Sequence, residues 1–385
     1  MKKIYFLLTA LCLFMSVNAQ IINDFDYRTL RRLLLTSTNL PIAKDIYGNN
    51  IKVDLNGDNK IDVSEALTVF ELDLRPEIVP GFTGGDYILT LNGLENFVNI
   101  RKINCSTNPI SLGWGSLNSL VNVEEIISDG NSSSLAINIH DLPHLKKMTW
   151  NHRNYLSGTQ WAPSIILSNL PRLEIFECNY MGIALLDIAN APNLKKIVAS
   201  NNNLASLNLV DFPSLEDLSV DMNKLTSINL TGLPLLKKLD VTTNLLTTLD
   251  VSAFSALEIL KCSKNRLTTL IIQDQTNLKS LSCFSNNLTS INVERLSSLK
   301  NLNCENNYIL SLNFQNSQNL EQLICRKNNL STLVVTNVPN LVQLICDQNQ
   351  ITAFSLINVP NLVSLDCSHN QIKDLTIKNT NASIY

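Results

Sequence analysis

Apolar and polar positions recur along most of this chain with a period of 21 residues. One copy begins at Leu278 and follows the pattern L-x-x-L-x-C-x-x-N-x-L-x-x-L-x-L. The regular copies open at Leu173, Leu194, Leu215, Leu236, Leu257, Leu278, Leu299, Leu320, Leu341 and Leu362. Looser copies open upstream at Ile100, Val123 and Leu145, at intervals of 23, 22 and 28 residues. A period of this length, repeated about thirteen times, predicts a solenoid of stacked units.

The start of each repeat predicts a short strand. In the segment L-x-x-L-x-C, side chains alternate, so the fourth and sixth positions point inward and the second, third and fifth face outward. Successive strands then stack in parallel. One repeat buries too few apolar side chains to offset the conformational entropy that ordering its backbone costs. We therefore expect the repeats to depend on stacking and on hydrogen bonds between coils.

The ninth position of the repeat is asparagine in an unbroken series: Asn202, Asn223, Asn244, Asn265, Asn286, Asn307, Asn328, Asn349 and Asn370. Here the chain leaves the strand and turns beneath the sheet, so backbone N–H and C=O groups are buried without strand partners. A side-chain amide offers both donors and an acceptor. The series predicts a structural asparagine ladder, and a polar ligand-binding row is the alternative.

These repeats resemble the leucine-rich repeat family, and the resemblance covers most of the chain. It implies an α/β solenoid: a leucine-rich repeat arc with a parallel β-sheet on one face, short strands or irregular turns on the other, and a small helical N-terminal cap. We expect a signal peptide at residues 1–19, the cap at 20–85 and the solenoid at 86–385, with regular repeats from residue 173.

The nine cysteines follow the same register. After the predicted loss of Cys12 with the signal peptide, eight remain at the sixth position of their repeats: Cys105, Cys178, Cys262, Cys283, Cys304, Cys325, Cys346 and Cys367. Other copies carry Ala199, Val220 or Val241 there, which indicates a small apolar core site. Side chains of neighbouring parallel strands point in nearly the same direction, a poor geometry for a disulfide. We predict packed free thiols, with disulfides or metal binding as less favoured alternatives.

The N-terminus has the organisation of a secretory signal. Lys2 and Lys3 precede an apolar stretch at residues 4–15, and Val17-Asn18-Ala19 forms a small-residue cleavage site. A lipoprotein signal acylated at Cys12 fits less well, because the preceding residues are a poor lipobox. We therefore expect a secreted or cell-surface protein.

Residues 20–85 are the candidate cap. Asp24 is predicted to cap a short helix that places Phe25, Leu30, Leu33 and Leu34 on one face. The segment that follows resembles an EF-hand loop, whose places 1, 3, 5, 7, 9 and 12 are filled by Asp54, Asn56, Asp58, Lys60, Asp62 and Glu65. Such places supply the oxygen ligands that calcium needs, Lys60 through its carbonyl. Asn59 stands where the loop normally has glycine, and a polar turn that binds nothing is the alternative.

The helix, this loop and the following residues 95–100 together resemble the N-terminal region of exported leucine-rich repeat proteins of the Bacteroidetes type, which are internalin-like. For such a cap, the resemblance implies a structural role for calcium.

Composition narrows the possible functions. The chain has 385 residues, with 30 Lys plus Arg against 33 Asp plus Glu and a formal net charge of −3. This balance gives no broad basic surface, so nucleic acid is not an expected partner. No apolar run after the signal is long enough to span a membrane. The motifs G-x-S-x-G and H-E-x-x-H, a P-loop and a dinucleotide fingerprint are all missing, so we do not expect an enzyme.

The outward strand positions and the two residues after each strand form the surface that leucine-rich repeat proteins most often use for recognition. Phe284, Ile324 and Ile345 are apolar where a solvated face would be polar, and Arg326 and Lys327 add positive charge. The predicted ligand face comprises Phe284, Ile324, Arg326, Lys327, Ile345 and His369, with Trp161 as a candidate sugar-stacking residue. An inert surface with scattered apolar residues is the alternative.

Two functions fit these features. The first is an exported or cell-surface binding or adhesion module that recognises a protein or polysaccharide through the repeat face. The second is the targeting portion of a larger extracellular enzyme whose catalytic domain lies outside this chain. Leucine-rich repeats serve too many partners for the fold to name the ligand.

Overall fold

The computed structural model describes residues 20–78, 81, 86–111, 113–131, 136–152, 164–313 and 317–380. The predicted signal peptide and Trp161 lie outside these residues. The chain forms two compact units, one up to Leu194 and the other from Lys195. Within the described part, no helix is both long and apolar enough to cross a membrane.

The first unit begins with a small helical region. Helix α2 (Tyr27–Leu34) begins after Asp26, whose side chain accepts a hydrogen bond from the backbone N–H of Arg28. The prediction that Asp24 caps this helix was wrong, because Asp26 lies where an N-cap oxygen can reach the free N–H groups of the first turn. Helix α3 (Val63–Ala66) follows the EF-hand-like loop, and short 3-10 helices cover Pro76–Ile78, Leu94–Asn96 and Trp114–Ser119.

Arg32 attaches helix α2 to the first strands of the sheet. Its guanidinium group donates to the carbonyl oxygens of Leu74 at 2.9 Å and Arg75 at 2.7 Å, just after strand β2 (Glu71–Asp73). The side chain is 2% exposed, and this burial lowers its pKa from the ordinary value. A buried arginine that donates to backbone carbonyls satisfies groups that water cannot reach.

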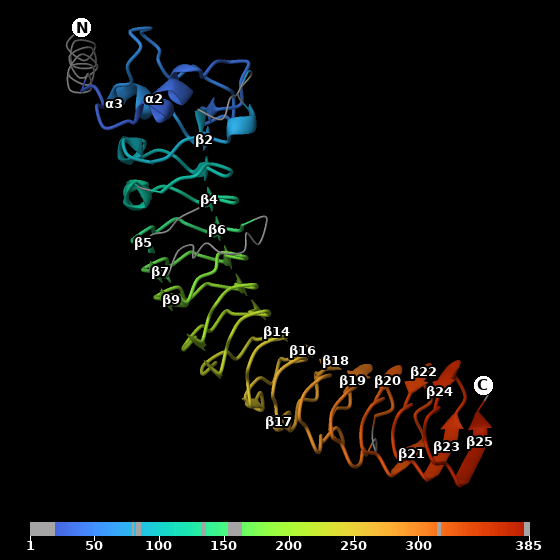
Figure 1. Cartoon of the computed structure of the whole chain (residues 1–385). Helices are drawn as coiled ribbons and strands as arrows, with labels where there is room; N and C mark the ends of the chain where they lie inside the picture. The colour runs from blue at the N-terminus through green and yellow to red at the C-terminus, as the bar shows by residue number, and fades with distance from the viewer. Residues whose placement is uncertain are drawn as a thin grey trace, which may run out of the picture. The chain divides into compact units, whose positions relative to one another are not determined.

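The first unit carries two sheets (Figure 1). Its main sheet contains β1 (Ala43–Lys44), β2, β3 (Lys102–Asn104), β4 (Glu125–Ile127), β6 (Lys147–Thr149) and β8 (Ile175–Glu177). Strand β1 pairs antiparallel with β2, and the later neighbours pair in parallel. The second sheet contains β5 (Ile137–His140), β7 (Ser164–Ser168) and β9 (Leu185–Ala189). Each coil thus contributes a strand to the main sheet, and three coils also contribute one to the opposite side.

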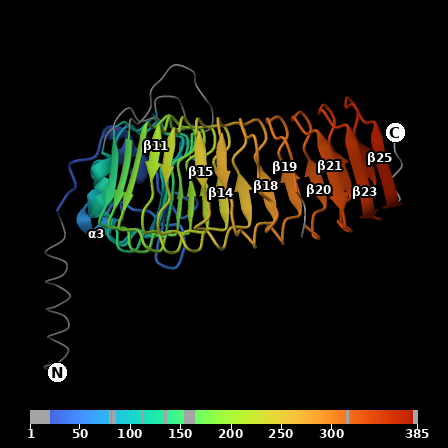
Figure 2. The same ribbon diagram turned by 90° about the horizontal axis from the view of Figure 1, so that it is seen from below.

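The second unit repeats the same arrangement (Figures 1 and 2). Its main sheet contains β10 (Lys196–Val198), β12 (Asp217–Ser219), β14 (Lys238–Asp240), β16 (Ile259–Lys261), β18 (Ser280–Ser282), β19 (Asn301–Asn303), β20 (Gln322–Ile324), β22 (Gln343–Ile345) and β24 (Ser364–Asp366). The other layer contains β11 (Ser206–Asn208) with β13 (Ser227–Asn229), β15 (Thr248–Asp250) with β17 (Thr269–Ile271), and β21 (Thr332–Thr336) with β23 (Ala353–Val359) and β25 (Asp374–Thr380). These strands pair in parallel.

The predicted alternation of inward and outward positions is confirmed. Parallel pairing keeps the 21-residue register, as in Leu281 opposite Leu302 and Leu302 opposite Leu323. These fourth-position leucines are at most 1% exposed, whereas the third and fifth positions of the same strands are partly or fully exposed. The predicted fold, a parallel β-solenoid with short strands on its other side and a small helical N-terminal region, is therefore the observed one.

The asparagine ladder forms as predicted. Asn286 illustrates it: its amide nitrogen donates to the carbonyls of Cys262 at 3.0 Å and Cys283 at 2.9 Å, and its oxygen accepts from the N–H of Leu267 at 3.0 Å. One side chain thereby joins its own repeat to the preceding one. From Ala199 to Cys346, each sixth-position carbonyl accepts from two successive asparagines, as Cys283 does from Asn286 and Asn307.

The same ladder extends into the irregular repeats of the first unit. Asn108 donates to the carbonyls of Leu74 at 3.0 Å and Cys105 at 3.2 Å, and Asn131 donates to Cys105 at 3.0 Å. The oxygen of Asn131 accepts from the backbone N–H of Asn108 at 2.7 Å. The ladder is therefore a general device of these coils and does not depend on the strict 21-residue spacing.

The cysteines are free thiols in the structure, which confirms their predicted state. Seven are buried, and Cys367 is half-buried. Burial raises the pKa of Cys105 and Cys304 to about 12 and raises the pKa of the other six thiols as well. Such thiols stay protonated near neutral pH, so they act as core side chains and are poor nucleophiles.

Asn286→Leu is expected to reduce stability by about 2–4 kcal/mol, because the buried N–H of Leu267 loses its acceptor and two further hydrogen bonds disappear. Thermal denaturation followed by circular dichroism should show the melting temperature falling by at least about 5 °C. The neighbouring Asn287 is exposed, so Asn287→Leu is the matched control and should change stability by less than about 0.5 kcal/mol. Equal melting temperatures for Asn286→Leu and the parent protein would refute the ladder.

Thiol titration tests the state of the cysteines. In the native protein without its signal peptide, we expect Cys367 alone to react with a thiol reagent, because the other seven side chains are buried. Denaturation without reductant should expose eight reactive groups in total. Fewer groups under those conditions would mean that disulfides form.

Candidate functional site

The predicted ligand face lies on the outward side of the main sheet of the second unit. Ile324 and Ile345 are fifth-position residues that pair in register across strands β20 and β22, so their side chains stand next to each other. Both are partly exposed, although the fourth-position leucines beside them are fully buried. The structure therefore places two apolar side chains next to each other on the outward face, where the other apolar strand residues of this unit, Val198 and Ile259, stand singly.

The backbone bends sharply after each strand. The eighth position has a left-handed backbone throughout the second unit, with φ between 52° and 57° at Asn201, Met222, Thr243, Lys264, Ser285, Asn306, Lys327, Gln348 and His369. The backbone N–H at this position donates to a backbone carbonyl of the next repeat, as the N–H of Lys327 does to the carbonyl oxygen of Asp347 at 3.1 Å. Lys327 and His369 are both exposed. This bend places the predicted residues of the eighth position along the rim of the sheet.

Phe284 occupies the seventh position, directly after strand β18. Its ring is partly exposed, and the ammonium group of Lys264 lies 5.8 Å from the ring centroid. Its backbone N–H donates to the side chain of Ser263 at 3.1 Å, which fixes the start of the bend. Phe284 is therefore held at the edge of the face and remains open to solvent.

Arg326 does not form the free basic spot that the sequence indicated. Its guanidinium group lies 3.1 Å from the carboxylate of Asp347 and 3.8 Å from that of Glu305, both in neighbouring repeats. Asp347 is itself only 3% exposed. These two carboxylates neutralise the charge of Arg326. Among the predicted face residues that the structure describes, Lys327 is therefore the lysine or arginine whose charge can reach a ligand. Trp161 lies outside that part of the chain.

A hollow on the first unit was not predicted. It has a volume of about 330 Å³ and is lined by residues of strands β1 to β4 and the segments next to them. Ile42 and Leu72, both buried, contribute to its apolar lining. Lys44, Glu71 and Lys102 line it as charged residues. The first unit therefore has a hollow whose lining is partly apolar and partly charged.

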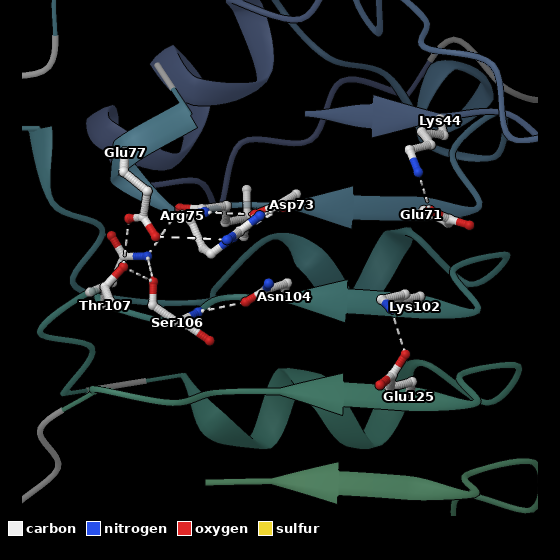
Figure 3. Close-up of polar contacts among 12 residues, drawn as sticks. Lys44, Glu71, Asp73, Arg75, Glu77, Lys102, Asn104, Ser106, Thr107 and Glu125 are labelled. Atoms are coloured by element: carbon white, nitrogen blue, oxygen red, sulfur yellow. Dashed lines mark hydrogen bonds and ion pairs between the residues drawn. The ribbon is translucent and has the colours of Figure 1, made fainter. Parts of the chain in front are cut away.

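The charges beside this hollow form an alternating column. Lys44, Glu71, Lys102, Glu125 and Lys147 follow one another in register across the strands. Their ion pairs are short: 2.8 Å for Lys44 with Glu71 and 2.6 Å for Lys102 with Glu125 (Figure 3). Lys147 lies 2.9 Å from Glu125 on its other side. Each charge of the column therefore has a partner of opposite sign, and Glu125 is shared by Lys102 and Lys147. The alternation of sign at the third position of successive repeats was visible in the sequence and could have identified it.

Arg75 and Asp73 form a second paired element at the hollow. The guanidinium group of Arg75 contacts both carboxylate oxygens of Asp73, at 3.0 Å through Nε and 2.7 Å through a terminal nitrogen (Figure 3). This hydrogen-bonded pair raises the pKa of Arg75 above its ordinary value. Lys44 and Lys102 are paired as well, with Glu71 and Glu125, so the hollow lacks the unpaired charge that a strongly ionic ligand would need.

The second unit has a comparable hollow of about 270 Å³ over strands β12 to β16. Asp217, Lys238, Asp240 and Lys261 line it. Lys238 lies 4.0 Å from Asp217, and Lys261 lies 3.4 Å from Asp240. The charges of this part of the face are again arranged in opposite-sign neighbours.

The EF-hand-like loop folds through a series of side-chain to backbone hydrogen bonds. Asp54 accepts from the N–H of Gly57 at 2.7 Å, Asn56 from Asp58 at 2.8 Å, and Asp58 from Lys60 at 2.9 Å. Each is a local turn of the kind that aspartate and asparagine favour. Asn59 adopts a left-handed backbone with φ of 61°, so asparagine makes the bend where a glycine is usual.

Glu65 closes the loop. Its carboxylate accepts from the backbone N–H of Leu55 at 2.7 Å and of Asp62 at 3.0 Å, and Asp62 accepts in return from the N–H of Glu65 at 3.0 Å. This reciprocal pair is a capping box at the start of helix α3. In the described residues, no group of three or more His, Cys, Asp or Glu side chains is positioned to hold a metal ion.

The chemistry of the loop nevertheless suits calcium. The six predicted ligands, Asp54, Asn56, Asp58, Lys60, Asp62 and Glu65, offer oxygen atoms only, and several of them lie on one turn of chain. Calcium would supply a central positive charge for these acceptors, and Glu65 would exchange its backbone hydrogen bonds for the ion. Calcium binding is therefore our proposal for this loop.

Comparisons with known proteins agree with the architecture. Residues 339–379 match a family model described as leucine-rich repeats, two copies. Among solved structures, an internalin, InlF, of Listeria monocytogenes is 20% identical, with a TM-score of 0.54 over 82% of this chain and 85% of the other. The functional domain of InlJ of the same organism, which includes a cysteine ladder, is 18% identical, with a TM-score of 0.54 over 94% and 74%.

YopM, a leucine-rich effector protein of Yersinia pestis, is 23% identical, with a TM-score of 0.53 over 73% of this chain and 78% of the other. A comparison with curated proteins finds no match. At these identities the likenesses show the fold, which is a leucine-rich repeat solenoid. The closer resemblance to Bacteroidetes-type proteins stays a prediction.

A calcium titration tests the proposed loop. We expect 1 mM calcium to raise the melting temperature relative to a chelator, because an ion that binds only the folded loop stabilises it by about 2.7 kcal/mol at a hundred times its Kd. Asp54→Ala with Glu65→Ala should abolish this difference. Asp58→Asn is the sharper variant: it keeps an acceptor oxygen for Lys60 but removes a charge, so it should weaken calcium binding and leave the chelated protein unchanged. Equal melting temperatures of the parent protein with calcium and with chelator would exclude the site.

Proposed function

We propose that this protein is an exported binding module that recognises a protein or polysaccharide at the cell surface through the outward face of the second unit. The observation that carries the proposal is the partly exposed pair Ile324 and Ile345, side by side on the main sheet. Apolar side chains inside a polar rim are typical of recognition surfaces, where they gain free energy when a partner covers them.

The rigidity of the base supports this role. The strands that carry Ile324 and Ile345 are fixed from below by buried leucines and by the ladder residues Asn328 and Asn349. A ligand that binds such a face does not have to order its backbone first, which reduces the entropic cost of association. Export is supported by the predicted signal at residues 1–19.

Arrays of glycans and of purified extracellular proteins test this function, each probed with and without calcium. Replacing Ile324 and Ile345 together by aspartate should weaken binding at least tenfold, because two charges would be buried against the ligand. Val334→Asp is the control, since Val334 is 56% exposed on strand β21 of the other layer. Binding that survives the double substitution, or the absence of binding on both arrays, would contradict the proposal.

A further inference from the structure

Three amide side chains stand in a row on the outward face beside the isoleucine pair. Asn301, Gln322 and Gln343 occupy the third position of strands β19, β20 and β22 and pair in register. Asn301 and Gln343 are partly exposed and Gln322 is fully exposed. Within the described structure, none of the three side chains forms a hydrogen bond, so each has two N–H donors and an oxygen acceptor open to solvent.

This lack of partners distinguishes the row from other amides of the same unit. Asn307 and Asn328 are consumed by the internal ladder. Exposed asparagines elsewhere also bond to one another along the repeats, as Asn358 does with Asn337 at 2.7 Å and Asn379 with Asn358 at 2.8 Å. Exposed amides at equivalent positions of successive repeats can thus bond to one another, and those of Asn301, Gln322 and Gln343 do not.

The outward strand positions around the row are uncharged. The outward third and fifth positions of strands β18, β19, β20 and β22 form what we term the neutral strip: Ser280, Ser282, Asn301, Asn303, Gln322, Ile324, Gln343 and Ile345. The charges that border it at the second position are paired, as in Lys300 with Glu321 at 2.7 Å. The strip thus contrasts with the charged part of the face around Lys238 and Lys261, and it fits a partner without net charge.

Hydroxyl groups are the natural partners of such amides, because a hydroxyl both donates and accepts a hydrogen bond. The three amides are spaced by the separation of neighbouring strands, about 4.8 Å. An extended peptide lying across the strands presents backbone groups on one side only every second residue, about 6.6 Å apart, so it would not match successive amides. A sugar chain carries several hydroxyl groups on each ring and can meet this closer spacing.

Resting on the proposed function of this face, we propose that the neutral strip binds an uncharged polysaccharide chain that runs across strands β18 to β22. Asn301, Gln322 and Gln343 bond its hydroxyl groups. Ile324 and Ile345 contact the apolar C–H surfaces of its rings, and Phe284 offers a partly exposed aromatic ring at one end of the strip. The strip itself contains no cation that could pair with the carboxylates of an acidic polysaccharide.

Affinity electrophoresis and calorimetry on the chain without its signal peptide test this inference. The probes are soluble neutral polysaccharides, namely a β-glucan, a mannan, a xylan and an arabinan, with alginate as the acidic comparison. We expect at least one neutral chain to bind and alginate not to bind. Gln322→Ala with Gln343→Ala should weaken that binding at least tenfold without changing the melting temperature, because neither amide has an intramolecular bond to lose.

The matched control is Gln350→Ala with Gln371→Ala, which removes two exposed glutamine amides from the tenth position of adjacent repeats. This pair should change affinity by less than twofold. Failure of every neutral polysaccharide to bind, preferred binding of alginate, or full affinity of the Gln322 and Gln343 variant would each overturn the inference. The face could instead bind a protein, and that binding would disappear when Ile324 and Ile345 are replaced by aspartate. This result, without polysaccharide binding, would overturn the inference and leave the proposed function intact.

Discussion

The ladder of ninth-position asparagines, at Asn108, Asn131 and from Asn202 to Asn370, is the interaction on which the rest of this structure depends. The side chain of Asn286 bonds two carbonyls and one N–H from two successive repeats, at the point where the chain leaves the sheet and those groups have no strand partners. An apolar residue would fill the space but leave the Leu267 N–H unsatisfied. The strands are only three residues long in most coils, so strand pairing does not reach the turns. The asparagine ladder provides the hydrogen bonds between coils there.

This constraint also determines where variation is possible. Inward positions accept small apolar residues, which explains why cysteine, alanine and valine interchange at the sixth position while all eight thiols remain free. The strands determine the distance between neighbouring outward side chains but not which residues stand there. Charged, amide and apolar residues can therefore replace one another at these positions from repeat to repeat. The same strand geometry carries paired charges around Lys238 and unbonded amides around Gln322.

The sequence predicted the features that the repeat itself imposes: the strands, the inward leucines, the asparagine ladder and the packed thiols. It also identified the residues of the outward face, because their register follows from the same period. It missed features that depend on contacts between repeats, such as the pairing of Arg326 with Asp347 and the hollow beside Lys44. The helix cap was misplaced from Asp26 to Asp24, since both lie near the helix start and only the backbone geometry separates them.

Amide hydrogen exchange at the eleventh position of the repeats tests the central role of the ladder most directly. The N–H groups of Leu267, Leu288 and Ile309 each donate to a ladder asparagine at 3.0 or 3.1 Å. We expect these amides to exchange as slowly as those of the strand residues Leu281 and Leu302, because their bonds break only when neighbouring coils separate. Exchange at the rate of exposed loop amides would show that the asparagines do not hold the coils together.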